Sequence, residues 1–239
     1  MSKLLSSKLL SSNVQAGIRL ALCLAVIAGY VDAYAFLAYR VYVSFMSGNA
    51  TQTGSLLGQA KLAAVGPLML AMLFFVIGAV AGSWLATSQL ANPRRVLFAV
   101  TAAALAMTIG GTLAHPAGFP ADACIAMLTM AMGLMNATHS ESLSLTVMTG
   151  TLYRVGTHLA LGIRHAPLAG AHGPWDTHFH RARVGASILA AFLIGATASG
   201  AATLFFGAWA LLPAALLLLG LALFSRRARL PVVASSQLV

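Results

Sequence analysis

The fold is decided by the stretch Val43-Ser-Phe-Met-Ser-Gly-Asn-Ala-Thr-Gln-Thr-Gly-Ser-Leu-Leu-Gly58. It begins with the alternation typical of a β-strand, breaks at Ser47-Gly48-Asn49, and continues with helix-like spacing. The stretch is too polar for an ordinary membrane helix, yet it lies between two apolar segments. The pattern therefore predicts a broken segment over residues 41–60, in which a strand-like run is followed by a half-helix.

The same chemistry recurs later as Val147-Met-Thr-Gly-Thr-Leu-Tyr-Arg-Val-Gly-Thr157. Both copies read Met-[Ser/Thr]-Gly-[Asn/Thr], followed by Gly-[Ser/Thr] six residues after the first glycine. This predicts a second broken segment over residues 143–162. The rest of the chain is interpreted around this pair.

The composition is that of an integral membrane protein. Of 239 residues, 59% are hydrophobic and 8% are charged, with a mean hydropathy of +0.88. A water-soluble domain of this length cannot bury so many apolar side chains. Apolar runs of about 20 residues recur, which is the length that a helix needs to cross about 30 Å of hydrocarbon. The lipid bilayer is therefore the expected partner.

The net charge of +10 does not indicate nucleic-acid binding. The chain lacks a basic stripe with interleaved aromatic residues, and basic loops are what the positive-inside rule produces. Cys23 and Cys124 both fall in apolar segments, where we expect packing residues. We expect no metal and no cofactor.

The hydropathy pattern predicts an all-α membrane domain with about six full spans. The predicted spans are 16–39, 64–89, 96–113, 121–138, 184–206 and 210–224. They form one transmembrane domain over 16–225, between tails at 1–15 and 226–239.

Three local matches occur in the same order in both halves of the chain. Gly29-x-x-Asp32-Ala matches Gly133-x-x-Asn136-Ala, the two Met-[Ser/Thr]-Gly motifs match, and Phe75-Val-Ile-Gly-Ala matches Phe192-Leu-Ile-Gly-Ala. The halves, about 16–114 and 119–225, would each hold three spans and one broken segment. An odd number of crossings inserts two halves in opposite orientations, so the pattern predicts a 3+3 inverted repeat.

The charges favour re-entrant broken segments over segments that cross fully, although one arginine pair, Arg94-Arg95, carries most of that distinction. With re-entrant segments, both termini and most basic residues are cytoplasmic, and only Arg40 and Lys61 lie outside. The histidine-bearing loop over 165–180 is then cytoplasmic as well.

We expect a binding site where the two broken segments meet. Gly48 and Gly150 would permit the change of direction and should tolerate valine less well than Gly78, while Ser47 and Thr149 would cap the half-helices. The free N–H groups of those half-helices would then face mid-membrane. The candidate binding residues are Asp32, Ser47, Gly48, Asn49, Thr51, Asn136, Thr149, Gly150 and Thr151. The alternative is that both segments are polar, glycine-rich helices that pack closely on their neighbours.

Asp32 is an acidic residue inside a predicted span, where a carboxylate is costly and usually faces protein or water. One interpretation makes it a titrating member of the site. The other makes it an interfacial partner of Arg40, two helical turns away. Its counterpart Asn136 cannot titrate, so the two halves are chemically unequal.

The polar loop near the second broken segment contains residues that can bind metals. A solvated histidine-rich loop is the preferred interpretation of His172, Asp176, His178 and His180, because no helical spacing fixes them as ligands. The sequence contains neither HExxH nor GxSxG, and no Ser/His pair lies within a predicted span. We therefore expect no catalytic residues.

At these motifs the sequence resembles the bacterial YoaK-type family of small membrane proteins, a family with a domain of unknown function. The resemblance rests on Gly29-x-x-Asp32-Ala, Met46-Ser-Gly-Asn49, Gly133-Leu-Met-Asn136-Ala and Met148-Thr-Gly-Thr151, and covers about residues 18–225. It implies a protein of the inner membrane with about six spans, and it implies no substrate.

The expected function is that of a small secondary transporter or permease for a small molecule or ion. One alternative is a membrane assembly or stress factor, which needs no polar cavity. The other is an intramembrane enzyme, which needs a nucleophile–base pair or metal ligands inside a span. A homo-oligomer is compatible with each of these functions.

Overall fold

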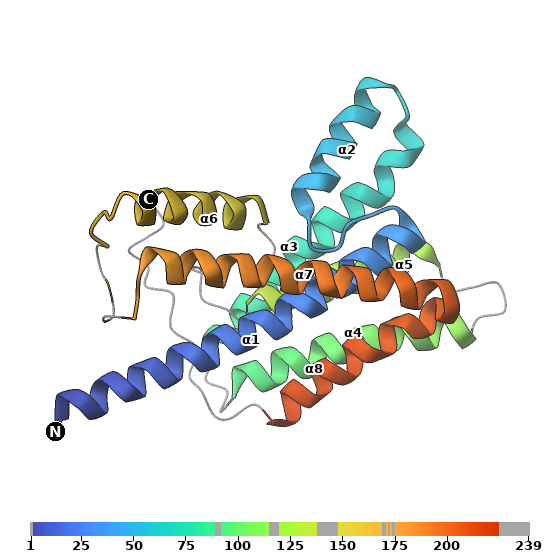
Figure 1. Cartoon of the computed structure of the whole chain (residues 1–239). Coiled ribbons are helices and arrows are strands. Elements are labelled where there is room, and N and C mark those ends of the chain that lie inside the picture. Colours follow the sequence, from blue (N-terminus) through green and yellow to red (C-terminus); the bar gives the residue numbers. More distant parts are fainter. Residues whose placement is uncertain are drawn as a thin grey trace.

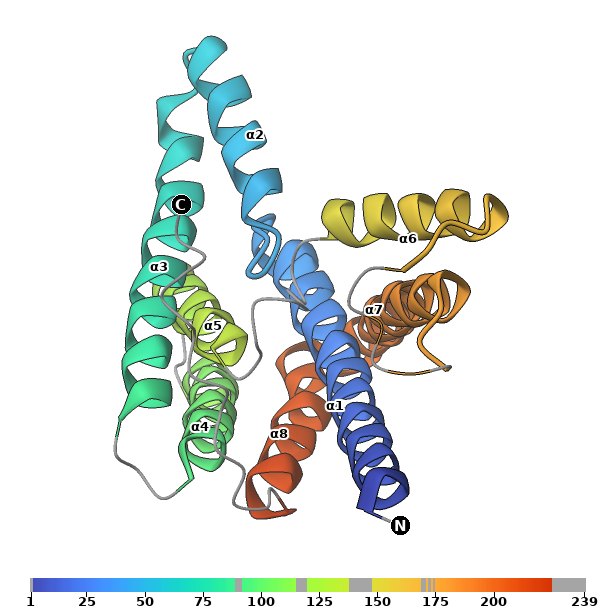
Figure 2. The ribbon, with the colours of Figure 1, turned by 90° about the vertical axis from the view of Figure 1, so that its left-hand side faces the viewer.

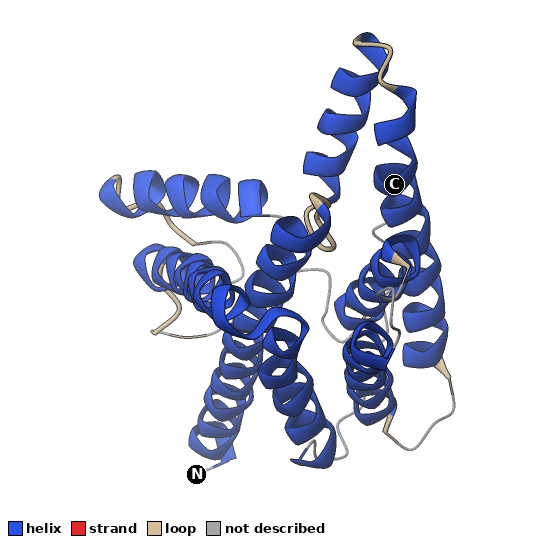
Figure 3. Cartoon of the chain, turned by 90° about the vertical axis from the view of Figure 1, so that its right-hand side faces the viewer, coloured by secondary structure: helices blue, strands red, loops and turns tan. Residues whose placement is uncertain are grey.

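The computed structural model describes residues 2–88, 92–114, 120–137, 148–168, 171, 173 and 175–224, without the side chains of residues 2–14, 111 and 114. Its helices are α1 (Ser2–Tyr39), α2 (Met46–Gly58), α3 (Val65–Thr87), α4 (Pro93–Ala114), α5 (Ala121–Asn136), α6 (Met148–Ile163), α7 (His178–Phe206) and α8 (Leu212–Phe224) (Figure 1). Two short 3₁₀ turns, η1 (Leu62–Ala64) and η3 (Gly207–Leu211), precede α3 and α8. Within these ranges the protein is entirely helix and loop (Figure 3).

Four stretches of the described chain are long and apolar enough to cross a membrane. They are Gln15–Tyr39, Leu62–Thr87, Pro93–Gly110 and His178–Phe224. The last stretch has 47 residues and contains a reversal, because the chain turns back at η3 between α7 and α8 (Figure 1). Ala121–Asn136 is a shorter apolar helix. The all-helical membrane-type fold is thus confirmed, and the number of six spans stays a prediction.

The helices pair between the two halves of the chain. α1 packs along α7, α3 packs along α5, and α4 packs along α8. Figure 2 shows the α4–α8 pair below, and it shows α2 and α3 rising together as a hairpin. α6 forms a second hairpin by packing on α7. The first helix of each predicted half therefore packs on the third helix of the other.

Glycines bring α1 and α7 into backbone contact. A methyl group added at Gly29 would overlap the carbonyl oxygen of Phe192 in α7. One added at Gly195 would overlap the carbonyl oxygen of Val26 in α1. The two helices cross here at a distance that only small residues permit, which is how membrane helices pack closely.

The crossing of α3 and α5 repeats this arrangement with the matching residues. A methyl group at Gly133 would overlap the carbonyl oxygen of Phe75, and one at Gly78 would overlap that of Met130. The sequence prediction that Gly78 tolerates valine better than Gly48 is therefore wrong. Gly78 faces backbone, which cannot move aside as a side chain can.

The apolar core lies among α1, α4, α5, α7 and α8. Its largest fully buried side chains include Leu24, Phe98, Leu128 and Leu218. By contrast, much of α3 exposes apolar side chains, among them Val80 at 65% and Trp84 at 76%. Exposed apolar surface on a long apolar helix is expected where lipid is the solvent.

The predicted spans agree with the observed helices to within a few residues at most ends, and one local expectation is wrong. α1 begins at Ser2, so residues 2–15 of the predicted tail are helical, and their cytoplasmic location stays a prediction. Residues 41–45 form an irregular connection where a strand-like run was predicted. The other strand-like run, before Met148, lies outside the described residues.

Candidate functional site

The first break is the connection between α1 and α2, residues 40–45. α1 ends at a left-handed residue, Arg40 with φ of 58°, whose N–H donates to the carbonyl of Phe36 at 3.0 Å. The backbone that follows makes no regular helix until Met46. Because its N–H groups have no helical partners, this segment needs hydrogen-bond acceptors from elsewhere.

Asp32 supplies one of those acceptors. Its Oδ1 atom accepts hydrogen bonds from the backbone N–H groups of Val43 and Ser44, both at 2.8 Å. The Asp32 side chain is 5% exposed. Successive N–H groups that converge on one anion form a small anion-binding nest. The nest before α2 is therefore occupied by the protein's own carboxylate.

The structure does not support the ion pair between Asp32 and Arg40. Both residues are described, and no ion pair joins them. The Arg40 guanidinium lies instead over the Phe36 ring, 5.7 Å from its centroid. Asp32 is thus part of a buried backbone contact, and the interfacial pairing proposed from the sequence does not form.

Asn49 fixes the same connection from the other side. Its Oδ1 accepts from the N–H of Tyr42 at 3.0 Å, and its Nδ2 donates to the carbonyl of Tyr42 at 2.6 Å. Its side chain is fully buried. The Tyr42 ring stacks on Phe36 and meets the Phe45 ring edge-on, with centroids 4.7 and 5.4 Å apart. Asp32 and Asn49 together bind the backbone N–H groups of Tyr42, Val43 and Ser44, and Asn49 also binds the Tyr42 carbonyl.

Gly48 does not form the predicted change of direction, because the chain is already helical there. It lies inside α2, and a methyl group there would come within 2.5 Å of the Phe45 ring and 3.0 Å of the Tyr42 ring. The prediction that Ser47 caps the half-helix is wrong, because α2 follows Phe45 and has no side-chain cap. Ser47 is exposed, and its carbonyl accepts from the Thr51 hydroxyl at 2.9 Å.

The second break is described only in part. Asn136 ends α5 and donates from Nδ2 to the Met132 carbonyl at 3.0 Å. Thr149 and Gly150 lie inside the first turn of α6, so Thr149 is not the residue that precedes this helix. The Thr151 methyl group faces Gly185 of α7.

Figures 1 and 2 show that the first turn of α6 lies on the same side of α1 as the first turn of α2. Around the first break the structure gathers Asp32, Gly48 and Asn49, while Ser47 and Thr51 lie on the exposed part of α2. Residues 138–147, which would complete the second break, lie outside the described chain.

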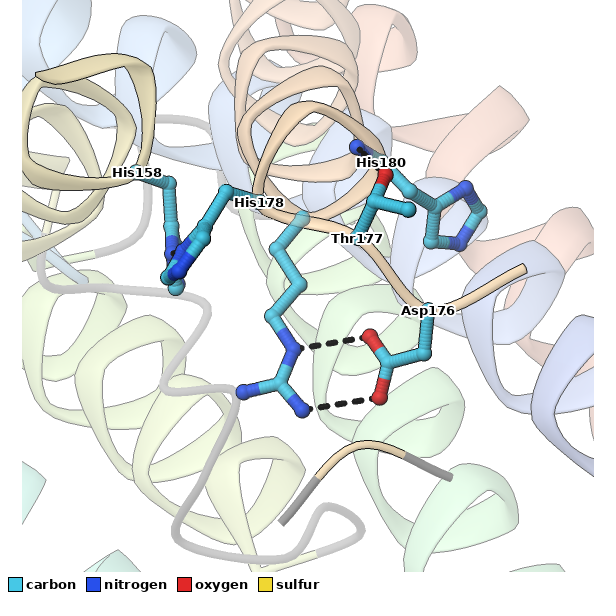
Figure 4. A network of polar contacts seen from close by, with 6 residues as sticks. His158, Asp176, Thr177, His178 and His180 are labelled. Carbon is cyan, nitrogen blue, oxygen red and sulfur yellow. Dashed lines mark hydrogen bonds and ion pairs between the residues drawn. The ribbon is translucent and has the colours of Figure 1, made fainter. Parts of the chain in front are cut away.

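A histidine pair joins α6 to α7, and the sequence interpretation missed it. The Nδ1 atoms of His158 and His178 are 2.9 Å apart (Figure 4). Two ring nitrogens at this distance share a hydrogen bond only when one of them carries a proton. The sequence feature that could have revealed the pair is the spacing of Thr151, His158 and Gly162. This spacing places the three residues on the face of α6 that meets α7.

Asp176 and Arg181 lie beside this pair. The Arg181 Nε and Nη2 atoms donate to the two carboxylate oxygens of Asp176, both at 2.8 Å (Figure 4). The Thr177 hydroxyl caps α7 by accepting from the N–H of His180 at 3.1 Å. His172 lies outside the described residues. Among the residues that are described, no three His, Cys, Asp or Glu side chains are grouped to hold a metal ion.

The histidine pair predicts a pH dependence. Burial, then the nearby His178 and Arg181, lower the pKa of His158 from its ordinary value of 6.5, against the attraction of Asp176. The folded protein thus favours neutral His158, and this contribution to stability is present above about pH 6.5 and lost as the pH falls through the lowered pKa. We expect the unfolding temperature of the wild type to fall more steeply on acidification than that of His158→Gln, followed in detergent by tryptophan fluorescence.

His165→Gln is the matched control for this measurement. His165 is exposed just after α6, so its removal should leave the pH profile of the wild type unchanged. If the unfolding temperatures of the wild type and His158→Gln fall in parallel on acidification, neutral His158 does not contribute to the pH dependence of stability.

These features define a polytopic helical protein of the membrane-spanning type, with an irregular connection held by buried polar side chains. The chain belongs to the family described as Protein of unknown function (DUF1275), which matches residues 20–224. No curated protein and no solved structure matches the chain significantly.

Proposed function

We propose that the protein is a small secondary transporter or permease, built as a 3+3 inverted repeat, with its binding site where the two broken segments meet. The observation that carries the proposal is the reciprocal packing of the glycine crossings. Residues that match in sequence, Gly29 with Gly133 and Phe75 with Phe192, also take matching places in the α1–α7 and α5–α3 contacts. This packing supports a two-fold relation between the halves.

The remaining helices are compatible with that relation. α4 and α8 end the two halves and pack on each other, as elements near a two-fold axis would. α2 packs on α3, and α6 packs on α7, so each half contributes one hairpin. Three spans in each half would insert the halves with opposite orientations, which is the architecture of many secondary transporters.

The first break supports a site rather than simple helix packing. Irregular backbone at membrane depth is tolerated when it is buried in protein or lines a polar cavity. Here the buried polar side chains of Asp32 and Asn49 hold residues 42–44 in place through hydrogen bonds to the backbone. In the proposed mechanism Asp32 is the protonatable side of the site and Asn136 is the fixed polar side.

The proposal places both termini in the cytoplasm and the protein in the inner membrane, which follows the basic residues and the YoaK-type resemblance. It leaves the substrate as a small molecule or ion. The alternative function, a non-transporting assembly or stress factor, requires no water-filled path between the two breaks.

Uptake into proteoliposomes tests the function. We expect at least one member of a metabolite and ion panel to be taken up saturably and to exchange across the membrane, whereas protein-free liposomes take up none. In parallel, single cysteines at Thr51 and Thr151, placed in a variant without Cys23 and Cys124, should react with a water-soluble thiol reagent. No uptake together with two unreactive cysteines would overturn the proposal and favour the assembly factor.

A further inference from the structure

We propose that the end of the α6–α7 hairpin binds the head group of an anionic phospholipid. This end, called the basic hairpin end, consists of residues 163–165 at the close of α6 and residues 175–183 at the start of α7. The two parts lie together because α6 packs back on α7, with His158 against His178 (Figure 4). The inference does not depend on a transport function.

The basic hairpin end carries an excess of positive charge. Arg164, His165 and Arg183 are exposed. Its acidic residue, Asp176, is 7% exposed and is held by both nitrogens of the Arg181 fork. The carboxylate therefore neutralises Arg181 and leaves the exposed arginines to attract an anion. Arginine recognises phosphate well, because its planar group can donate two parallel hydrogen bonds.

Apolar side chains stand beside these charges, and they favour a lipid over a soluble anion. Ile163 is 70% exposed, Phe179 is 51% exposed, and Trp175 is 36% exposed. Tyr153 extends the same pattern along α6 at 76%. Exposed aromatic residues next to basic ones are typical of a membrane interface, where rings reach the acyl boundary and cations reach the phosphates.

The chain contains its own comparison for this surface. The α2–α3 hairpin has the same plan, and its turn holds Lys61 beside the exposed Leu62. Its described residues carry no arginine. If the loop charges only orient the protein in the membrane, both hairpins should attract anionic lipid weakly. A specific site would bind anionic lipid in preference to neutral lipid at the basic hairpin end alone.

The experiment measures the unfolding temperature of the full-length protein in mixed micelles while phosphatidylglycerol replaces phosphatidylcholine, at constant ionic strength. We expect phosphatidylglycerol to stabilise the wild type. For the double variant Arg164→Gln, Arg183→Gln, the concentration that gives half the effect should rise about 25-fold, or roughly fivefold for each arginine near a lipid surface. Lys61→Gln should keep the wild-type titration.

Two further samples keep the result decisive. The double variant Arg164→Lys, Arg183→Lys retains the charge and should retain most of the stabilisation, which covers the case in which the glutamine variant folds poorly. Inorganic phosphate at the same concentration should not reproduce the effect. Equal stabilisation by both lipids, an unchanged titration in the glutamine variant, or full replacement by phosphate would overturn the proposal.

Discussion

Gly29→Ala will lower the stability of the protein more than Gly17→Ala, the other glycine-to-alanine change in α1. The new Cβ would overlap the carbonyl of Phe192, so either α1 and α7 move apart or the backbone shifts. Overpacking of a tight core costs about 1–3 kcal/mol, and we expect the upper end of that range because the obstacle is backbone. The measurement is thermal unfolding of the purified protein in detergent.

Gly17→Ala provides the control in the same helix. Nothing lies within 4 Å of a methyl group at Gly17, so this change should be neutral or slightly stabilising. Gly133→Ala should repeat the loss seen at Gly29, because its Cβ would overlap the Phe75 carbonyl in the matching crossing. If the Gly17 and Gly29 variants unfold at the same temperature, the close crossing does not exist.

Asp32→Ala will loosen the start of α2. The change removes the acceptor of two buried N–H groups, those of Val43 and Ser44. An unsatisfied buried group costs about 1–3 kcal/mol, so the pair should cost several kcal/mol in the free energy of unfolding. We expect lower thermal stability and faster hydrogen exchange over residues 40–50, with little change in the α4–α8 pair.

Asp32→Asn distinguishes the structural role of Asp32 from its proposed role in transport. The amide oxygen can accept both hydrogen bonds, and the side-chain volume is kept, so the variant should fold with little loss of stability. It cannot titrate, so pH-dependent uptake should disappear. Arg40→Gln should have neither effect, because Arg40 lies over Phe36 and not against Asp32. Full uptake across the pH range in Asp32→Asn would remove Asp32 from the mechanism, whereas a loss of stability equal to that of Asp32→Ala would show that the fold needs the charge.

The sequence predicted the long apolar helices well because their apolar runs end at polar or turn residues. The expected span 64–89 corresponds to α3, Val65–Thr87, and the expected span 96–113 lies inside α4, Pro93–Ala114. The sequence also predicted an interruption in this region, but placed it at Ser47-Gly48-Asn49, whereas the irregular connection covers residues 40–45. These features depend on local composition, which a single chain displays directly.

The errors came from contacts between distant residues. Alternation over residues 41–46 suggested a strand, but the connection is shaped by Asp32 and Asn49, which lie on helices at either side. Gly78 looked tolerant because the Met130 carbonyl that it faces is on another helix. The His158–His178 pair was missed because its two members lie on different helices, with a loop between them.

The crosswise packing has a consequence for how the protein is made. Roughly 160 residues separate Gly29 from the Phe192 carbonyl that it faces, so α1 is synthesised long before its partner α7. At about 5–20 residues per second, roughly 10–30 seconds pass before that partner emerges from the ribosome. During this interval the glycine face of α1 is covered by lipid or by the insertion machinery. The main packing partners of α1 and α5 are α7 and α3, so these contacts form only after distant parts of the chain have been made.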